Sequence, residues 1–266
     1  MPDPEQRYGF EVRQRRRGIY LLPNLFTTAA LFAGFFAIVQ AMNGKFQLAA
    51  IAIFVAMVLD GLDGRVARLT RTQSAFGAEY DSLSDMVSFG AAPALVVYEW
   101  ALKDLGRWGW IAAFLYCACA ALRLARFNTQ LDVADKRYFT GLPSPAAAAL
   151  LAGLIWIMVD YEIVGRRIDW LVWSVTVFAG LTMVSNVKFY SFKTINLRKS
   201  VPFWAMLLVV LFFVIITIDQ PRVRFVLFVA YALSGYVTWA WNRLKGRKRS
   251  ADTEPTSSDQ KRPDNF

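Results

Sequence analysis

The sequence of 266 residues contains no histidine. Histidine is the commonest general base in enzymes and the usual protein ligand of zinc, so proton transfer and metal binding must rest on other side chains. The chain has only two cysteines, Cys117 and Cys119, and both fall inside one apolar segment, where packed thiols are expected rather than a disulfide or a metal pair. Glycine-rich phosphate loops, serine nucleophile elbows and internal repeats are also missing, which argues against several common enzyme classes.

Charged residues are scarce at 19%, whereas 56% of the residues are hydrophobic. The apolar runs are too long and too many for the core of a soluble protein of this length. We therefore predict an all-α fold, a polytopic membrane helix bundle with about eight transmembrane helices. The predicted spans are Ile19 to Met42, Phe46 to Leu69, Phe76 to Leu102, Trp108 to Phe127, Leu142 to Val159, Trp170 to Val187, Phe203 to Ile218 and Arg224 to Trp241.

The distribution of positive charge predicts the orientation of these spans. Most of the 30 Lys and Arg residues fall on one side if the amino terminus is cytoplasmic, and positively charged loops are retained in the cytoplasm. Both termini should then be cytoplasmic, with a basic segment at 1–18, the membrane domain at 19–242 and a disordered tail at 243–266. Because the net charge of +10 lies beside membrane spans, anionic lipids are the expected partners and nucleic acid is not.

Four aspartates interrupt this apolar pattern in the segments DGLDGRVAR and GAEYDSLSD. Asp60 and Asp63 lie toward the cytoplasmic end of the second predicted span, and Asp81 and Asp85 lie in the first turns of the third. Because the two helices are antiparallel, the two pairs should meet at one depth. Ionisable groups at membrane depth are costly and are functional candidates by default.

Four converging carboxylates cannot all stay ionised without a counter-charge. A pair of divalent cations would supply that charge, and oxygen-only ligands suit Mg²⁺ or Mn²⁺. The alternative is a network of salt bridges with Arg65, Arg68 and Arg71.

The spacing of these residues also resembles that of a known family. Eight residues fit every position of the signature of the CDP-alcohol phosphotransferases, namely Asp60, Asp63, Gly64, Ala67, Arg68, Gly77, Asp81 and Asp85. The resemblance implies a Mg²⁺- or Mn²⁺-dependent displacement on a CDP-linked lipid. It also implies that Asp60 and Asp81 bridge two ions, that Asp63 completes one site and that Asp85 completes the other and acts as general base. Contacts to the CDP group are implied for Gly64, Arg68 and Ser74.

Four further segments narrow the resemblance to membrane-integral bacterial phosphatidylserine synthases. They are YLLPNLFTTAALFAGFFAI from Tyr20, ALRLARFN from Ala121, FTGLPSPAAAA from Phe139 and KFYSFK from Lys188. The resemblance implies that L-serine attacks CDP-diacylglycerol, releasing CMP and phosphatidylserine. It also implies a homodimer in the bacterial cytoplasmic membrane, with the active site facing the cytoplasm. Spacing alone does not select serine as the acceptor.

Basic residues near Asp85 are candidates for binding the serine carboxylate. Arg123 and Arg126 lie three residues apart at the cytoplasmic end of the fourth span and are favoured. Asn128, Lys188 and Lys193 are weaker candidates, because topology or lipid contact explains each lysine equally well. Asn24 and Thr27 are candidates for nucleotide contact, with helix capping as the alternative.

Two other functions compete with this reading. The same chemistry could use glycerol phosphate, inositol phosphate or choline as the acceptor. The buried carboxylates could instead belong to a cation or proton transporter.

Overall fold

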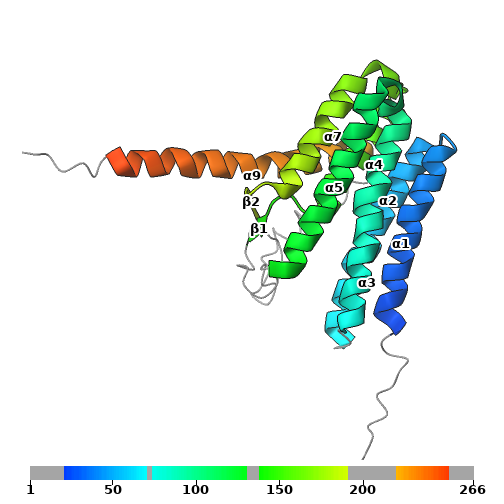
Figure 1. Cartoon of the computed structure of the whole chain (residues 1–266), viewed down its shortest axis with the longest axis horizontal. Coiled ribbons are helices and arrows are strands. Elements are labelled where there is room, and N and C mark those ends of the chain that lie inside the picture. Colours follow the sequence, from blue (N-terminus) through cyan, green and yellow to red (C-terminus); the bar gives the residue numbers. More distant parts are fainter. Residues whose placement is uncertain (1–20, 71–73, 131–137, 191–219, 252–266) are drawn as a thin grey trace, which may run out of the picture.

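The computed structural model describes residues 21–70, 74–130, 138–190 and 220–251, and within these ranges the chain is almost entirely helical (Figure 1). The longest regular helices agree with predicted spans to within a few residues, apart from α9, which is longer than the span predicted inside it. They are α1 (Leu21–Met42), α2 (Phe46–Thr70), α5 (Arg107–Gln130), α6 (Ser144–Asp160), α7 (Asp169–Val184) and α9 (Gln220–Ala251). The predicted seventh span, Phe203 to Ile218, lies outside the described residues.

A composite helix takes the place of the third predicted span. It consists of α3 (Ala75–Asp85), the π-helix η3 (Met86–Ala91), α4 (Ala92–Val97), a second π-helix η4 (Tyr98–Leu102) and the 3₁₀ turn η5 (Lys103–Leu105). The residues at the junctions keep right-handed helical backbone angles, so the helix is continuous. The π turns were not predicted, and such turns occur frequently at functional sites.

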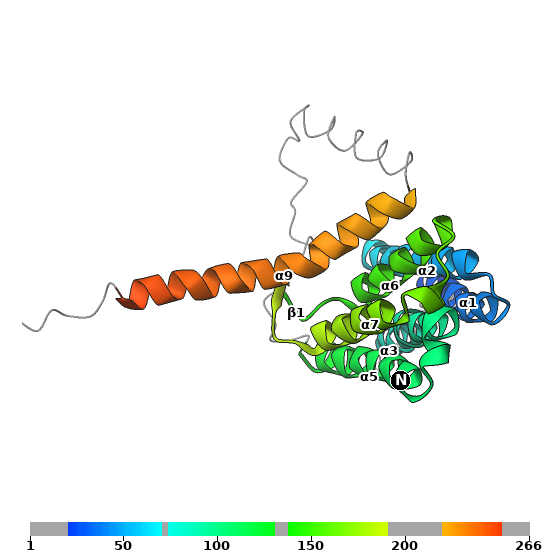
Figure 2. The ribbon, with the colours of Figure 1, turned by 90° about the horizontal axis from the view of Figure 1, so that it is seen from above.

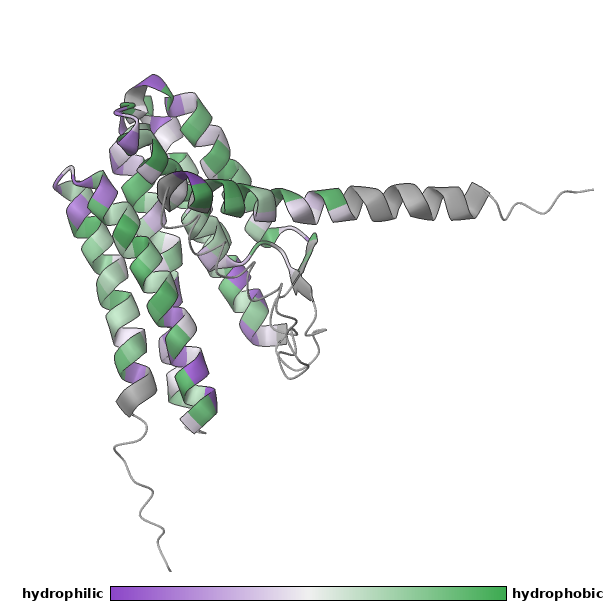
Figure 3. Ribbon diagram, turned by 180° about the vertical axis from the view of Figure 1, so that it is seen from behind, coloured by the Kyte–Doolittle hydropathy of each residue, from purple (hydrophilic) through white to green (hydrophobic). Residues whose placement is uncertain are grey.

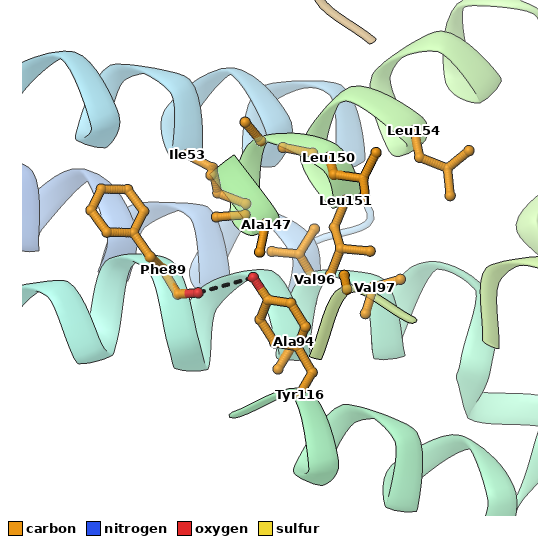
Figure 4. Packing of buried hydrophobic residues seen from close by; sticks show 14 of the residues in the cluster. Ile53, Phe89, Ala94, Val96, Val97, Tyr116, Ala147, Leu150, Leu151 and Leu154 are labelled. Carbon is orange, nitrogen blue, oxygen red and sulfur yellow. Dashed lines mark hydrogen bonds between the residues drawn. The ribbon is translucent and has the colours of Figure 1, made fainter. Parts of the chain in front are cut away.

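Pro93 gives a local reason for the irregularity of this helix. Proline has no N–H group, so it cannot donate to the carbonyl four residues earlier, which belongs to Phe89. The hydroxyl of Tyr116 on α5 donates to that carbonyl instead, at 3.1 Å (Figure 4). Tyr116 and Phe89 are both fully buried. The unconventional turn is thus held by a neighbouring helix.

Small side chains allow the helices to approach closely. Helices in lipid associate through packing of small residues, since lipid is as apolar as the side chains. The most extensive contact joins α1 to α2, and alanines are buried on both. Larger apolar residues of α2, α4 and α6 fill the centre of the bundle (Figure 4). The buried alanines are Ala30, Ala33, Ala37 and Ala41 on α1 and Ala49, Ala50, Ala52 and Ala56 on α2.

Two short strands are an addition to the predicted all-α fold. β1 (Tyr138–Thr140) pairs antiparallel with β2 (Lys188–Tyr190), with Phe139 opposite Phe189. Aromatic residues favour strands when a partner is within reach, and the two segments flank the α6–α7 hairpin. Gly141 follows β1 at φ +80°, and its N–H donates to the Val187 carbonyl at 2.8 Å. This turn sets the start of α6.

The last described helix, α9, crosses the others at a steep angle and extends beyond β1 and β2 (Figures 1 and 2). It continues to Ala251, although the disordered tail was predicted to start at residue 243. Arg and Lys in this stretch are good helix formers despite their polarity. Residues 252–266 lie outside the described part of the chain.

Within the described ranges, three helices are long and apolar enough to cross a membrane, at Asn24–Met42, Phe46–Thr70 and Arg107–Thr129. Shorter apolar helices occur at Ser144–Asp160, Asp169–Val184 and Phe225–Thr238. Apolar residues predominate along the helices of the bundle (Figure 3). Large apolar side chains such as Phe32, Phe35 and Phe114 are more than half exposed. Such an exterior suits lipid rather than water. The count of eight spans stays a prediction.

Candidate active site

Three aspartates from two neighbouring helices form one cluster. Asp60 and Asp63 come from the carboxyl-terminal part of α2, and Asp81 comes from α3. One carboxylate oxygen of each lies within 4.8 Å of the others. Asp63 is buried, whereas Asp60 and Asp81 are partly exposed. The two helices therefore bring three of the four predicted aspartates together.

Asp85 lies one turn after Asp81, at the junction with η3. It is not a member of the three-carboxylate cluster, but its carboxyl group contacts that of Asp60. Its electrostatic neighbours also include Asp81 and the guanidinium of Arg123. Asp85 thus lies between the acidic cluster and a buried cation.

The cluster fits a hard divalent cation. All its donors are carboxylate oxygens, the ligands that Mg²⁺ and Mn²⁺ prefer. The Oδ1 atom of Asp81 is buried and has no hydrogen-bond partner among the described residues. Buried polar atoms are nearly always satisfied, so an oxygen of this kind beside two other carboxylates is a coordination position that a metal ion would fill.

Hydrogen bonds donated by hydroxyl groups join α1 to both aspartate-bearing helices. Thr27 Oγ1 donates to Asp63 Oδ2 at 2.7 Å. From the composite helix, Ser84 and Ser88 donate to the carbonyls of Thr27 and Ala30, each at 3.1 Å. These bonds connect α1 to the turns on either side of Asp85.

Of the predicted CDP-contacting residues, Gly64, Arg68 and Ser74 lie close to the aspartates along the chain, whereas Asn24 and Thr27 come from α1. Ser74 is the N-cap of α3, and its hydroxyl accepts a bond from the Gly77 N–H at 3.0 Å. Asn24 reaches the same glycine, since a Cβ built on Gly77 would lie 3.5 Å from Asn24 Oδ1. On α2, a Cβ on Gly64 would lie 3.7 Å from Arg68 Nη1. Asn24 and Ser74 thus meet at Gly77, and the Arg68 side chain lies over Gly64.

The two arginines proposed for serine have different partners. Arg123 is 9% exposed and donates from Nη1 to Ser144 Oγ on α6 at 2.8 Å. Its Nε has no hydrogen-bond partner among the described residues, and Asp85 and Tyr231 are among its electrostatic neighbours. Arg126 instead donates to the Val184 carbonyl at the end of α7, at 3.1 Å. Arg123 is therefore the arginine with donor capacity left beside Asp85.

The remaining serine-binding candidates are not gathered around Asp85 in the same way. Asn128 Nδ2 donates to Ser82 Oγ at 2.9 Å, so it joins α5 to α3. Lys188 contributes its backbone to β2, and Lys193 lies outside the described residues. Two residues near Arg123 were not predicted from the sequence: Ser144, which accepts its hydrogen bond, and Tyr231, an electrostatic neighbour. The sequence signal for Ser144 was its position between two prolines.

Comparison with known proteins gives a consistent set of relatives. A family profile described as CDP-alcohol phosphatidyltransferase matches residues 20–183. A Helicobacter pylori protein named CDP-diacylglycerol–serine O-phosphatidyltransferase is 36% identical over 228 residues, which cover 85% of this chain and 94% of that protein. A Mycobacterium tuberculosis protein of the same name is 41% identical over 155 residues, covering 55% of this chain and 53% of the relative. An archaetidylserine synthase of Methanothermobacter thermautotrophicus is 37% identical over 133 residues, covering 49% and 56%.

Proposed function

The chain belongs to the CDP-alcohol phosphatidyltransferase family, and we propose that it is a phosphatidylserine synthase. The serine hydroxyl oxygen attacks the phosphorus that carries diacylglycerol in CDP-diacylglycerol. A new P–O bond forms, the bond to the CMP oxygen breaks, and the hydroxyl proton passes to the enzyme. The products are phosphatidylserine and CMP.

The observation that carries this proposal is the convergence of Asp60, Asp63 and Asp81. The buried Asp81 Oδ1 atom has no hydrogen-bond partner in the part of the chain that the structure describes. Two Mg²⁺ or Mn²⁺ ions are proposed to be held by these aspartates together with Asp85. When bound, such ions stabilise negative charge on the pyrophosphate and on the departing CMP.

The side chains of the chain itself have separate tasks in this proposal. Asp85 accepts the proton of the attacking hydroxyl, a role for which a carboxylate must lie within hydrogen-bond reach of the substrate. Arg123 binds the serine carboxylate through its spare donor, because a guanidinium forms strong charge-assisted bonds to carboxylates. The CDP group is bound by Asn24, Gly64, Arg68 and Ser74.

The enzyme is proposed to work in a bacterial cytoplasmic membrane. Eight spans, both termini in the cytoplasm and an active site at the cytoplasmic face follow from the distribution of apolar segments and of Lys and Arg. Residues 19–242 form the membrane domain in this proposal. A homodimer and contacts of the basic loops with anionic lipids complete it.

The test is an assay of the purified full chain in lipid nanodiscs. CDP-diacylglycerol, L-serine and either Mn²⁺ or Mg²⁺ should yield equal amounts of CMP and phosphatidylserine, and Asp85→Asn should yield little of either. Absence of CMP release with both metals would remove the proposal. A panel with glycerol phosphate, inositol phosphate and choline identifies the acceptor. If one of these replaces serine as the better acceptor, the family assignment stands and the serine assignment fails.

A further inference from the structure

Thr27 connects both aspartate-bearing helices to α1. Its side chain is 4% exposed, as is that of Asp63, and the two are joined by the 2.7 Å bond from Thr27 Oγ1 to Asp63 Oδ2. Its carbonyl oxygen accepts the bond from Ser84, the residue before Asp85. A single residue of α1 thus contacts α2 through its side chain and α3 through its backbone.

The direction of these bonds matters for a carboxylate that binds metal. A hydroxyl that donates to one carboxylate oxygen restrains the rotation of the group and leaves the other oxygen for a cation. Hydrogen bonds of this kind around metal ligands orient them and affect metal affinity. The Thr27 hydroxyl is buried and its hydrogen bond goes to Asp63, a proposed metal ligand.

We propose that Thr27 is a positioning residue that orients the Asp63 carboxylate for metal binding. Through the Ser84 bond to its carbonyl, Thr27 also fixes the depth of α3 against α2, and so the separation between Asp63 and Asp81. This inference rests on the proposed metal site. It gives Thr27 a role through Asp63, in place of the nucleotide contact predicted from the sequence.

The test compares Mn²⁺ binding of the purified full chain with binding of three variants, measured from the electron paramagnetic resonance signal of free Mn²⁺. Thr27→Val keeps the shape of the side chain and removes the hydroxyl, and Thr27→Ser keeps the hydroxyl. Thr176→Val is the matched control. Thr176 is also fully buried and donates to a carbonyl at 2.7 Å, but that carbonyl belongs to Val172 within α7.

Thr27→Val should bind Mn²⁺ about 10- to 100-fold more weakly, the usual effect of removing a bond to a metal ligand. Thr27→Ser and Thr176→Val should stay within about 3-fold of the parent. The Mn²⁺ concentration for half-maximal CMP release should rise in parallel with the dissociation constant in Thr27→Val, while the KM for serine stays unchanged. If Thr27→Val does not fold, Thr27→Cys, with its weak S–H donor, should show a reduced affinity of the same sign.

The outcomes separate this inference from the function on which it rests. A parent chain that binds no Mn²⁺ refutes the metal site itself. A parent that binds Mn²⁺ together with a folded Thr27→Val or Thr27→Cys of equal affinity refutes the positioning role alone. An equal loss in Thr176→Val, or no recovery in Thr27→Ser, would show that packing rather than the hydroxyl is responsible, and this also overturns the inference.

Discussion

The clustered aspartates have different surroundings. Asp63 is deeply buried and hydrogen-bonded to Thr27, and Asp60 contacts Asp85. Asp81 has one carboxylate oxygen with no hydrogen-bond partner among the described residues. Carboxylates at such short distances repel one another in the ionised state, so a shared cation stabilises them together. A residue that contacts two ions should therefore matter more for metal affinity than one that mainly moves a proton.

Replacing the proposed bridging aspartates should affect metal affinity and turnover together. Asp60→Ala and Asp81→Ala each remove a carboxylate proposed to contact both ions, so Mn²⁺ binding and CMP release should both fall steeply. Asp85→Asn should mainly lower turnover, by about 10²- to 10⁴-fold if its principal task is proton transfer. Mn²⁺ titration and CMP release are measured on the same preparations. Parental Mn²⁺ affinity in Asp81→Ala would contradict the bridging role.

Changing Arg123 should affect the use of serine selectively. Arg123→Gln removes the buried charge that we assign to the serine carboxylate, and charge-assisted bonds contribute about 1.5–3 kcal/mol. The KM for serine should therefore rise at least about 10-fold, with a smaller change in the KM for CDP-diacylglycerol. Arg167→Gln, at an exposed residue that ends the turn η6 (Gly165–Arg167), is the control and should leave both constants unchanged. An equal rise of both KM values in Arg123→Gln would assign Arg123 to general packing.

The clustering of the aspartates could be predicted from the sequence, but the different hydrogen-bond partners of Arg123 and Arg126 could not. Spacing along two antiparallel helices was enough to bring Asp60, Asp63 and Asp81 together. Arg123 and Arg126 lie on neighbouring parts of one helix surface, about 60° apart at 100° per residue. Their roles differ because Ser144 and the end of α7 come from other parts of the chain.

At the scale of elements, the composite helix is held by its neighbours on two sides. The Tyr116 hydroxyl on α5 donates a hydrogen bond to the Phe89 carbonyl, and the Ser88 hydroxyl donates one to the Ala30 carbonyl on α1. The close approach of α1 depends on a glycine, because a Cβ on Gly34 would lie 2.7 Å from the Ser88 Cα atom. The backbone of Ser88 cannot move aside for the added atom in the way that a flexible side chain can.

Gly34→Ala should therefore destabilise the protein. The added methyl group separates α1 from η3, and overpacking of this kind typically costs about 1–3 kcal/mol. The melting temperature in detergent, followed by tryptophan fluorescence, should fall. Gly61→Ala in α2 is the control, because nothing lies within 4 Å of the added methyl group and alanine favours a helix interior. A lower melting temperature for Gly61→Ala than for Gly34→Ala would refute this account of the contact.

The length of the apolar runs was enough to predict the helices, but not their irregularities. Runs of about twenty apolar residues identify spans whatever lies beside them. The first π-helix, η3, depends on Pro93 together with a partner for the Phe89 carbonyl. The β1–β2 pair depends on two segments that meet across the α6–α7 hairpin. Helix α9 extends beyond the predicted span that ends at Trp241, because Arg and Lys favour helix without adding to an apolar run.

At the scale of the whole molecule, two patterns describe the membrane environment. Apolar residues predominate along the helices (Figure 3), and large apolar side chains such as Phe32 and Phe114 are exposed. The two ends of α2 differ in charge. Arg65 and Arg68 lie at the end that carries the aspartates, whereas the α1–α2 turn at the other end carries the single cation Lys45. An asymmetry of this kind orients membrane proteins during insertion. The charge asymmetry predicts the side of the membrane on which the aspartates lie, and this side can be tested without measuring activity.

Single cysteines at the two ends of α2 should react from opposite sides of the membrane. In a background carrying Cys117→Ala and Cys119→Ala, Asn43→Cys lies in the α1–α2 turn and Thr70→Cys ends α2 beside the site. A membrane-impermeant maleimide should label Asn43→Cys in intact spheroplasts and Thr70→Cys only after permeabilisation, since the Arg-rich end is retained in the cytoplasm. CMP release by both variants would verify that they are folded. The reverse labelling pattern would put the aspartates on the outer face, away from a cytoplasmic supply of serine and CDP-diacylglycerol, and would contradict the proposed orientation.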